Sequence, residues 1–311
     1  MSLHRLLGLG ASVADPAALS AFYAELGLTG NAGAGFTGSD GGASMRVAEG
    51  PFRRLDSVTV GCEDQSDLTA ATMRLRAGGA EVDIDDGMLS VVDPASRVRF
   101  EVQVASRAPT QAPPVLVVPN SPGAVLRANR RAPTVFAGPR PPRRLGHLVL
   151  GTPNLGGTVS LLIEGLGFRL TDSVEGIITF LRCSTDHHNI AVVESPVPLL
   201  QHYAWECDDV DHVGHAATAL YRTLPERHVW GMGRHFAGSN FYWYLRDPSG
   251  SFIELYSDLD QILDDAAWEA IGRTEFAFEH VANSWGPNLP VEFIVPDDLE
   301  LLQKGWERWP S

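Results

Sequence analysis

The sequence has little cysteine, few basic residues and no long apolar run. Its three cysteines, Cys62, Cys183 and Cys207, are scattered over 311 residues, which argues against a disulfide framework or a cysteine-rich zinc site and favours small core residues. Lys and Arg number 24 against 38 Asp and Glu, for a formal net charge of −14. A nucleic-acid partner is therefore not expected, because phosphate backbones need a basic face.

Apolar runs such as 115–118 are too short to cross a bilayer, and the Gly-rich start, which soon meets Asp15, does not resemble a secretory signal. We expect a cytoplasmic protein without a membrane partner.

One segment also lacks acidic residues. Residues 107–144 contain no Asp or Glu, but they contain nine prolines and seven arginines. Proline removes amide donors and fixes φ, so this stretch cannot form a long helix or a central strand. It is predicted to be a linker between two domains. Its arginines could bind an acidic partner, but pairing with carboxylates of this acidic protein is the better interpretation.

The halves on either side of the linker share a pattern of elements. A strand and an acidic turn precede an Ala-rich helix over 58–75, and the same succession recurs over 204–220. An Asp-Pro turn leads into a strand with an embedded Glu over 93–102 and again over 247–256. The pattern indicates an internal duplication of an α+β unit with many short strands and few helices.

Each half also opens on a strand that is followed by a helix. The first such pair is expected over 7–13 and 16–26, and the second over 147–150 and 155–166. A further short helix is expected in the tail at about 261–271.

The residues that could carry chemistry are concentrated in the second half. His147 shares a strand face with Val149, His202 lies in another strand, and Glu254 stands between apolar neighbours in a third. A lone carboxylate in an apolar strand is costly to bury unless it is paired or bound to a metal. Two imidazoles and one carboxylate suit a non-heme Fe(II) site, which leaves coordination positions open for substrate and O2. Because no local spacing enforces such a site, three unrelated strand residues are the alternative.

Several further motifs make a resemblance specific. They are Gly146-His147, Asp186-His187-His188-Asn189-Ile190-Ala191, His202, Gly233-Arg234-His235, the run from Ser239 to Gly250, and Phe252-Ile253-Glu254-Leu255-Tyr256. In order and spacing, residues 145–260 resemble the catalytic domain of type I extradiol ring-cleaving dioxygenases, of the vicinal oxygen chelate superfamily. The first half resembles the family more weakly.

The resemblance implies roles for individual residues. Three positions match the metal ligands: His147, His202 and Glu254. Three match the acid–base histidine and the residues that hydrogen-bond the bound diol: His188, His235 and Tyr244. Four are expected near the substrate pocket: Val149, Phe180, His187 and Asn240. For His212, His215 and His228 a structural or surface role is favoured.

The resemblance also implies the architecture and the reaction. It predicts an α+β fold of tandem paired βαβββ modules that form two incomplete-barrel domains. The expected divisions are an N-terminal non-catalytic domain, a linker, a C-terminal metal-binding domain and a tail that forms a lid or a subunit contact: 1–106, 107–144, 145–260 and 261–311. The implied reaction is extradiol cleavage of an aromatic diol by O2 with Fe(II), or Mn(II), which accepts the same ligands. A homo-oligomer is expected, and apolar Val149 and Phe180 favour a hydrophobic substituent on the diol.

The first half departs from the pattern that the ligands require. Its corresponding positions are expected near Leu7, Asp56 and Glu101, so one carboxylate is retained but no histidine, and this half is predicted to bind no metal. Two other functions on the same fold stay open. One is a glyoxalase-like metal-dependent lyase, and the other is a metal-free protein that binds a small molecule.

Overall fold

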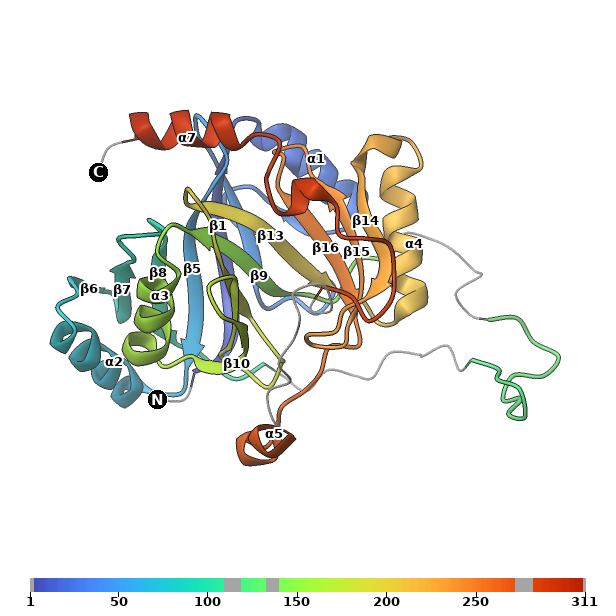
Figure 1. Ribbon diagram of the computed structural model, residues 1–311, viewed down its shortest axis with the longest axis horizontal. Helices are drawn as coiled ribbons and strands as arrows, with labels where there is room; N and C mark the ends of the chain where they lie inside the picture. The colour runs from blue at the N-terminus through green and yellow to red at the C-terminus, as the bar shows by residue number, and fades with distance from the viewer. Residues whose placement is uncertain (1–2, 109–118, 133–139, 272–281, 310–311) are drawn as a thin grey trace.

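The structure is a computed structural model that describes residues 3–108, 119–132, 140–271 and 282–309. Two eight-stranded sheets of mixed direction form its frame, with the strand orders β2-β3-β4-β1-β5-β8-β7-β6 and β10-β11-β12-β9-β13-β16-β15-β14 (Figure 1). The two orders are the same once the second set is renumbered, so the predicted duplication is confirmed. Both sheets are open rather than closed barrels, as the predicted tandem βαβββ fold requires.

From here on, each eight-stranded sheet together with its helices is called a module. The first module contains the strands of the first sheet and two helices. Its elements are β1 (Leu3–Val13), α1 (Pro16–Leu26), β2 (Thr29–Asn31), β3 (Gly35–Thr37), β4 (Ser44–Glu49), β5 (Arg54–Cys62), α2 (Gln65–Ala77), β6 (Val82–Asp85), β7 (Met88–Val92) and β8 (Arg99–Val104).

The second module repeats this order and is followed by a tail. Its elements are β9 (Arg144–Thr152), α3 (Leu155–Ser160), the π-helix η2 (Leu161–Leu166), β10 (Arg169–Val174), β11 (Ile178–Arg182), β12 (Ile190–Glu194), β13 (Leu199–Glu206), α4 (Val210–Tyr221), the short 3-10 helix η3 (Pro225–Arg227), β14 (His228–Arg234), β15 (Phe241–Arg246) and β16 (Phe252–Ser257). The tail contains α5 (Asp265–Ile271), the 3-10 helix η4 (Val291–Phe293) and α7 (Leu299–Arg308).

Acidic residues begin the longer helices, as the sequence predicts. The side chains of Asp15, Asp64 and Asp209 accept hydrogen bonds from backbone N–H groups in the first turns of α1, α2 and α4. These N–H groups have no partner within the helix, so each cap satisfies an otherwise unpaired donor. Helix α1 ends at Gly27, whose φ of 86° suits glycine.

Two predicted helices have different bounds in the structure. The expected helix over 155–166 is α-helical only to Ser160 and continues as the π-helix η2. The tail helix starts at Asp265 rather than near Gln261, because Asp264 caps its first turn while Gln261 hydrogen-bonds the carboxylate of Asp186. Of the helices in the described ranges, none has the length and apolar character that a membrane span would need.

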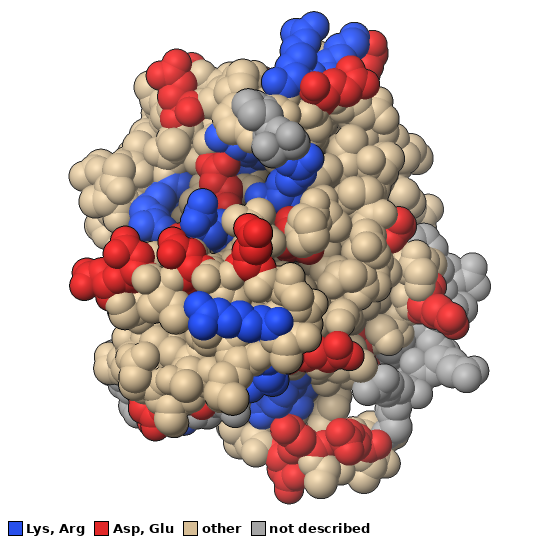
Figure 2. All heavy atoms as spheres, turned by 90° about the vertical axis from the view of Figure 1, so that its left-hand side faces the viewer, with Lys and Arg blue, Asp and Glu red and all other residues tan. Residues whose placement is uncertain are grey.

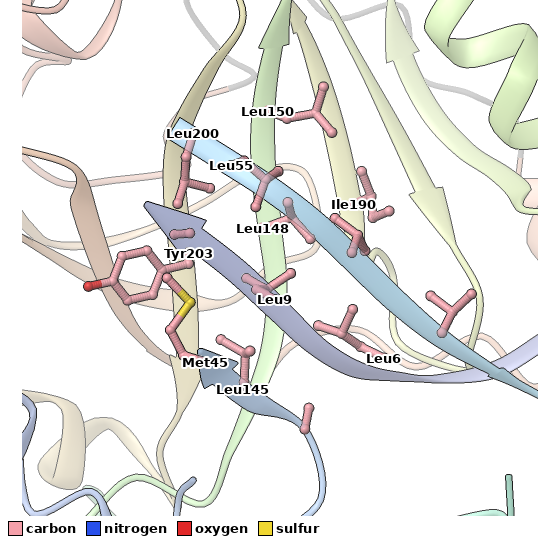
Figure 3. Close-up of a cluster of buried hydrophobic side chains, with 14 of the residues drawn as sticks. Leu6, Leu9, Met45, Leu55, Leu145, Leu148, Leu150, Ile190, Leu200 and Tyr203 are labelled. Carbon is pink, nitrogen blue, oxygen red and sulfur yellow. The ribbon is translucent and has the colours of Figure 1, made fainter. Parts of the chain in front are cut away.

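The two modules share one hydrophobic core. Side chains from the first sheet pack against side chains from the second, and Figure 3 shows Leu6, Leu9, Met45 and Leu55 beside Leu145, Leu148, Leu150, Ile190, Leu200 and Tyr203. Helix α1 contacts α4, and α2 contacts η2, so a helix pair flanks this core on each side (Figure 1).

The arginines next to the linker pair with carboxylates. Arg143 bonds Asp40 at 2.8 Å, Arg144 bonds Asp186 at 3.0 Å, and Arg140 bonds Asp208. The favoured interpretation of these side chains is therefore confirmed for this part of the segment. Much of the predicted linker, residues 109–118 and 133–139, lies outside the described residues. Basic and acidic side chains are also interspersed on the face that Figure 2 shows.

Candidate metal centre

Three neighbouring strands of the second sheet carry the predicted ligands. His147 on β9 lies opposite Ala204 on β13, and Ala204 lies opposite Glu254 on β16. His202 is two residues before Ala204 on β13, opposite Val149 of β9. Directly opposed residues project from the same face of a sheet. The three side chains thus share the face that points away from the core.

These side chains meet in space. One ligand atom from each of His147, His202 and Glu254 lies within 4.8 Å of the others, and no second cluster of this kind occurs among the described residues. The Glu254 carboxylate lies 2.8 Å from His147 Nε2 and 3.4 Å from His202 Nε2. All three side chains are buried. His202 Nε2 has no hydrogen-bond partner although it is buried. Because buried polar atoms normally have a partner, this nitrogen is available to coordinate a ligand.

A β-bulge directs His202 to this face. Leu200 lies opposite Leu150 and belongs to the shared core, whereas His202 lies opposite Val149, so the register shifts by one residue at Gln201. Without this extra residue Leu200 and His202 would project to the same side. The Gln201 side-chain oxygen accepts a hydrogen bond from His202 Nδ1, which leaves Nε2 free for the centre. Sequence reasoning missed Gln201, and its polar side chain between apolar strand residues was the available signal.

The surroundings of the centre lower the pKa values of both His202 and Glu254. Burial lowers the pKa of His202 below its usual value, despite the opposing effect of Glu254. Burial also pushes the pKa of Glu254 upward, but His147 and His202 outweigh it and bring that pKa well below its usual range. Neutral imidazole nitrogens and an ionised carboxylate are the forms that coordinate metals.

Two further predicted residues flank the ligands. The His188 ring lies 4.3 Å from the His147 ring, measured between centroids, and burial together with the neighbouring histidines holds the pKa of His188 well below its usual value. On the other side, Asn240 donates a hydrogen bond of 2.9 Å to Glu254 Oε1. This bond orients the carboxylate so that Oε2 faces the two histidines.

His235 and Tyr244 form a hydrogen-bonded pair at the edge of the centre. His235 Nδ1 donates to the backbone oxygen of Ala282, so its Nε2 accepts the hydrogen bond of 2.9 Å from the Tyr244 hydroxyl. Burial lowers the pKa of His235 to about 4 and raises the pKa of Tyr244 well above its usual value. The pair is therefore neutral, and the Tyr244 proton and the His235 Nε2 lone pair are engaged in one hydrogen bond.

The centre opens into a cavity of about 200 Å³. The predicted metal ligands line it, as do His188, His235, Tyr244, Val149, Phe180 and Asn240. His187, which is expected near the pocket, is not among the residues that line it: it is fully buried behind His188 and Phe180. The remaining wall is mostly apolar and includes Ile177, Ile178, Val193, Leu199, Trp230 and Ala237.

Part of the wall comes from the C-terminal strap, as we call residues 282–309. Leu289, Phe293 and Ile294 of this segment line the cavity, and in Figure 1 the red strap runs beside β15 and β16 before α7. It is anchored at its far end, where Arg53 of the first module bonds both carboxylate oxygens of Asp298 at 2.6 and 2.8 Å. Sequence reasoning considered a lid here but identified none of these contacts.

Helix α7 holds the end of the strap against both modules. Its Leu302 is buried in a small apolar cluster with Phe52, Val197 and Leu199, and the Trp306 indole donates to the backbone oxygen of Pro198 at 2.7 Å. The strap therefore forms one wall of the cavity and packs against the first module through Arg53 and Phe52.

Among residues 3–108, the described part of the first module, no equivalent group of ligands occurs. Glu101 lies opposite Thr59, and Thr59 lies opposite Gly8, so the counterparts of His147, His202 and Glu254 are Gly8, Ser57 and Glu101. The sequence places the first two near Leu7 and Asp56, and the structure puts them one residue further along, next to a register shift between Leu6 and Gly8. Glu101 accepts a hydrogen bond of 2.6 Å from the Thr59 hydroxyl and faces Arg46 at 3.7 Å.

Comparisons with known proteins agree with this architecture. Residues 144–255 match the family model described as the Glyoxalase/Bleomycin resistance protein/Dioxygenase superfamily. Metapyrocatechase 2 of Cupriavidus necator is 37% identical over 155 residues, which cover 49% of this chain and 47% of that protein. The 2,2',3-trihydroxybiphenyl dioxygenase of Sphingomonas paucimobilis is 26% identical over 261 residues, which cover 79% of this chain and 81% of that protein. The alignment thus spans about half of the first relative and most of the second.

A solved structure extends the likeness to the whole fold. The Mn(II)-bound glyoxalase from Novosphingobium aromaticivorans superposes with a TM-score of 0.69 at 24% identity, covering 93% of this chain and 94% of that one. The predicted resemblance is confirmed for the second module: residues 144–255 match the model of the Glyoxalase/Bleomycin resistance protein/Dioxygenase superfamily, and the similar proteins are named metapyrocatechase 2 and 2,2',3-trihydroxybiphenyl dioxygenase.

Proposed function

We propose that the protein cleaves a catechol-type aromatic diol with O2, beside rather than between the two hydroxyl-bearing carbons, at a mononuclear Fe(II) centre. The observation that carries this proposal is the convergence of His147, His202 and Glu254 at the floor of a cavity that His188 and Tyr244 also line. The relatives named as metapyrocatechase and trihydroxybiphenyl dioxygenase support the same reaction class.

The residues present fit a divalent ion. The donor set is two imidazole nitrogens and one carboxylate oxygen, and the unpartnered His202 Nε2 is turned toward Glu254. A bound Fe(II) would lower the pKa of a coordinated hydroxyl group and offer open positions to the diol and O2. Mn(II) accepts the same ligands, so the choice of metal is decided by reconstitution with each ion separately.

The protein's own residues would move protons on two sides of the diol. Tyr244 and His235 form one hydrogen-bonded pair, in which His235 Nε2 is the acceptor. His188 stands on the β12 side of the ligands and brings a second neutral imidazole to the cavity. A neutral imidazole can accept a proton that the diol loses, and its protonated form can return that proton to the oxygen that is being reduced.

The wall of the cavity favours a diol with an apolar substituent. Val149, Phe180 and Phe293 face it, and no Lys or Arg is found among its described lining residues. A substrate carboxylate would lack a cationic partner there, and burying an unpaired charge is costly. We expect a higher kcat/KM for 2,3-dihydroxybiphenyl than for 3,4-dihydroxyphenylacetate. A higher kcat/KM for 3,4-dihydroxyphenylacetate would contradict this assignment.

The proposal is tested on protein that is purified without air. Iron and manganese are quantified, the protein is reconstituted with Fe(II), and O2 uptake is followed with a panel of catechols, together with the absorbance of a yellow ring-opened product. One equivalent of O2 per diol is expected. Metal-loaded protein that takes up no O2 with any diol of the panel would exclude ring cleavage.

The two alternatives give different results in the same experiment. A glyoxalase-like lyase needs the metal but consumes no O2, and a metal-free binding protein retains no stoichiometric metal. The likeness to the Mn(II)-bound glyoxalase is one of fold, whereas the hydrogen-bonded pair of His235 and Tyr244 beside the ligands favours the dioxygenase. A homo-oligomer and a cytoplasmic location stay predictions.

A further inference from the structure

A buried chain of three titratable groups stands behind the cavity. Asp172 Oδ2 lies 2.8 Å from His187 Nε2, and His187 Nδ1 lies 3.1 Å from His188 Nδ1. The exposed fractions of Asp172, His187 and His188 are 7%, 0% and 5%. This series of hydrogen bonds runs from Asp172 on β10 to the His188 ring, which lines the cavity.

The chemistry of the groups sets the direction of these hydrogen bonds. An ionised carboxylate only accepts, so His187 Nε2 must donate to Asp172. A neutral imidazole then has only a lone pair on its other nitrogen, and the neutral form avoids a second buried charge. His188 Nδ1 must therefore donate to His187 Nδ1. The remaining nitrogen of His188, Nε2, carries a lone pair on the opposite side of the ring.

The surroundings hold this arrangement in place. The register between β10 and β11 shifts beside Thr171, and such a bulge re-aims the side chains next to it; Thr171 and Asp172 are both buried as a result. The backbone N–H of His187 donates to the oxygen of Asp260 at 2.8 Å. The Phe180 ring packs against both histidines, with centroids 5.7 and 5.2 Å away.

We propose that Asp172 and His187 are positioning residues, which hold His188 in the tautomer whose Nε2 lone pair faces the reacting molecule. This inference rests on the proposed function, because it assigns the pair a purpose in the proton transfers of that site. His188 could then take up a proton at Nε2 while its Nδ1–H stays bonded to His187. Without the pair, the ring could rotate or carry its proton on Nε2 from the start.

The tautomer can be measured without activity. Heteronuclear NMR of metal-free protein with isotope-labelled histidine distinguishes protonated from unprotonated ring nitrogens, and the His188→Ala spectrum assigns the His188 signals. We expect a protonated Nδ1 and an unprotonated Nε2 in the native protein. The opposite tautomer would overturn the inference even if the protein cleaves diols, whereas the expected tautomer in a protein that cleaves none would refute only the proposed function.

A matched pair of variants tests the effect on turnover. In His187→Asn the side-chain oxygen can still accept from His188 Nδ1, whereas in His187→Leu it cannot. We expect kcat to fall about 10- to 100-fold in His187→Leu, since it loses part of the 10²- to 10⁴-fold that an acid–base group contributes. His187→Asn should recover most of this loss, with KM for the diol and metal content unchanged in both.

Two further measurements separate positioning from packing. In a His188→Ala background, His187→Leu should lower kcat by less than about twofold, because effects that pass through one group are not additive. Asp172→Asn keeps the size of the side chain and provides a second probe if His187→Leu does not fold. Equal losses in His187→Asn and His187→Leu, or fully additive effects with His188→Ala, would mean that His187 only fills space.

Discussion

The two modules have the same strand order, yet only one of them assembles a centre. In the second, the opposed residues on three strands are His147, Ala204 and Glu254, and in the first they are Gly8, Thr59 and Glu101. The carboxylate is present in both. The difference is what it faces: two buried imidazoles in one module, and a hydroxyl group and the Arg46 guanidinium in the other.

The first module is also tightly packed at the counterpart of His147. A Cβ atom on Gly8 would lie 3.0 Å from the backbone oxygen of Ser44, so a larger side chain there requires the neighbouring strand to give by a few tenths of an ångström. This module contributes packing instead, since its sheet supplies half of the shared core and its Arg53 holds the strap that walls the cavity. The first module thus contributes packing and support, whereas the candidate metal ligands lie in the second module.

The largest contrast is expected at the two glutamates. Glu254→Gln should reduce bound metal to background and lower turnover more than about 100-fold. Even the loss of a residue that only hydrogen-bonds a metal ligand typically lowers metal affinity or activity about 10- to 100-fold. Metal analysis and O2 uptake measure both effects. Metal retained at one equivalent would remove Glu254 from the proposed ligand set.

The next contrast is between two buried histidines of the second module. His188→Ala should keep the metal and lower kcat about 10²- to 10⁴-fold. His212 bonds the backbone N–H of Asp208 and the backbone oxygen of Arg140, so His212→Ala should cost about 1–3 kcal/mol of stability without changing kcat per folded protein. Unaltered turnover in His188→Ala would end its acid–base assignment.

A smaller effect is expected where the modules meet at the strap. Arg53 is 7% exposed and bonds both Asp298 oxygens and the backbone oxygen of Leu200. Arg53→Ala should destabilise the protein by about 1–3 kcal/mol and raise KM for apolar diols more than it lowers kcat. Denaturation and steady-state rates measure this.

The adjacent exposed pair is the matched control for the strap anchor. Arg246 bonds Asp297 at 2.9 Å, and the Asp297 side chain is 68% exposed. Arg246→Ala should therefore change stability by at most about 0.5 kcal/mol. Equal effects of Arg53→Ala and Arg246→Ala would show that the first module does not support the cavity.

The smallest effect is expected at the counterpart glutamate. Glu101→Gln keeps an oxygen that can accept from Thr59, so we expect a stability change below about 1 kcal/mol and no change in metal content or turnover. The same assays as for Glu254→Gln apply. A loss of bound metal in Glu101→Gln would show that the two modules share the ion.

The resemblance named the residues of the centre, and two local signals agree with it. Strand alternation places His147 and Val149 on one face, and the embedded Glu254 marks a buried carboxylate, as the structure bears out. The helix caps at Asp64 and Asp209 follow from the same kind of short-range rule.

Other features escaped because both faces of the central strands are buried. On β13 a core leucine and a metal-site histidine are equally buried, so the apolar pattern does not reveal the bulge at Gln201. In the first module the sequence likewise gives the counterparts only approximately, and a register shift between Leu6 and Gly8 interrupts the alternation of β1 there.

The sequence by itself determined the order of elements, because helix caps and strand alternation depend on residues within a few positions of one another. It also indicated the duplication, because the same short patterns recur in both halves, whereas the ligand set followed from the resemblance of several motifs to a known family. Only the tertiary structure decided what faces what. Asp172 is 15 residues from His187, and Arg53 is 245 residues from Asp298. Contacts of this kind depend on how two sheets pack around one core, which no local pattern of side chains encodes.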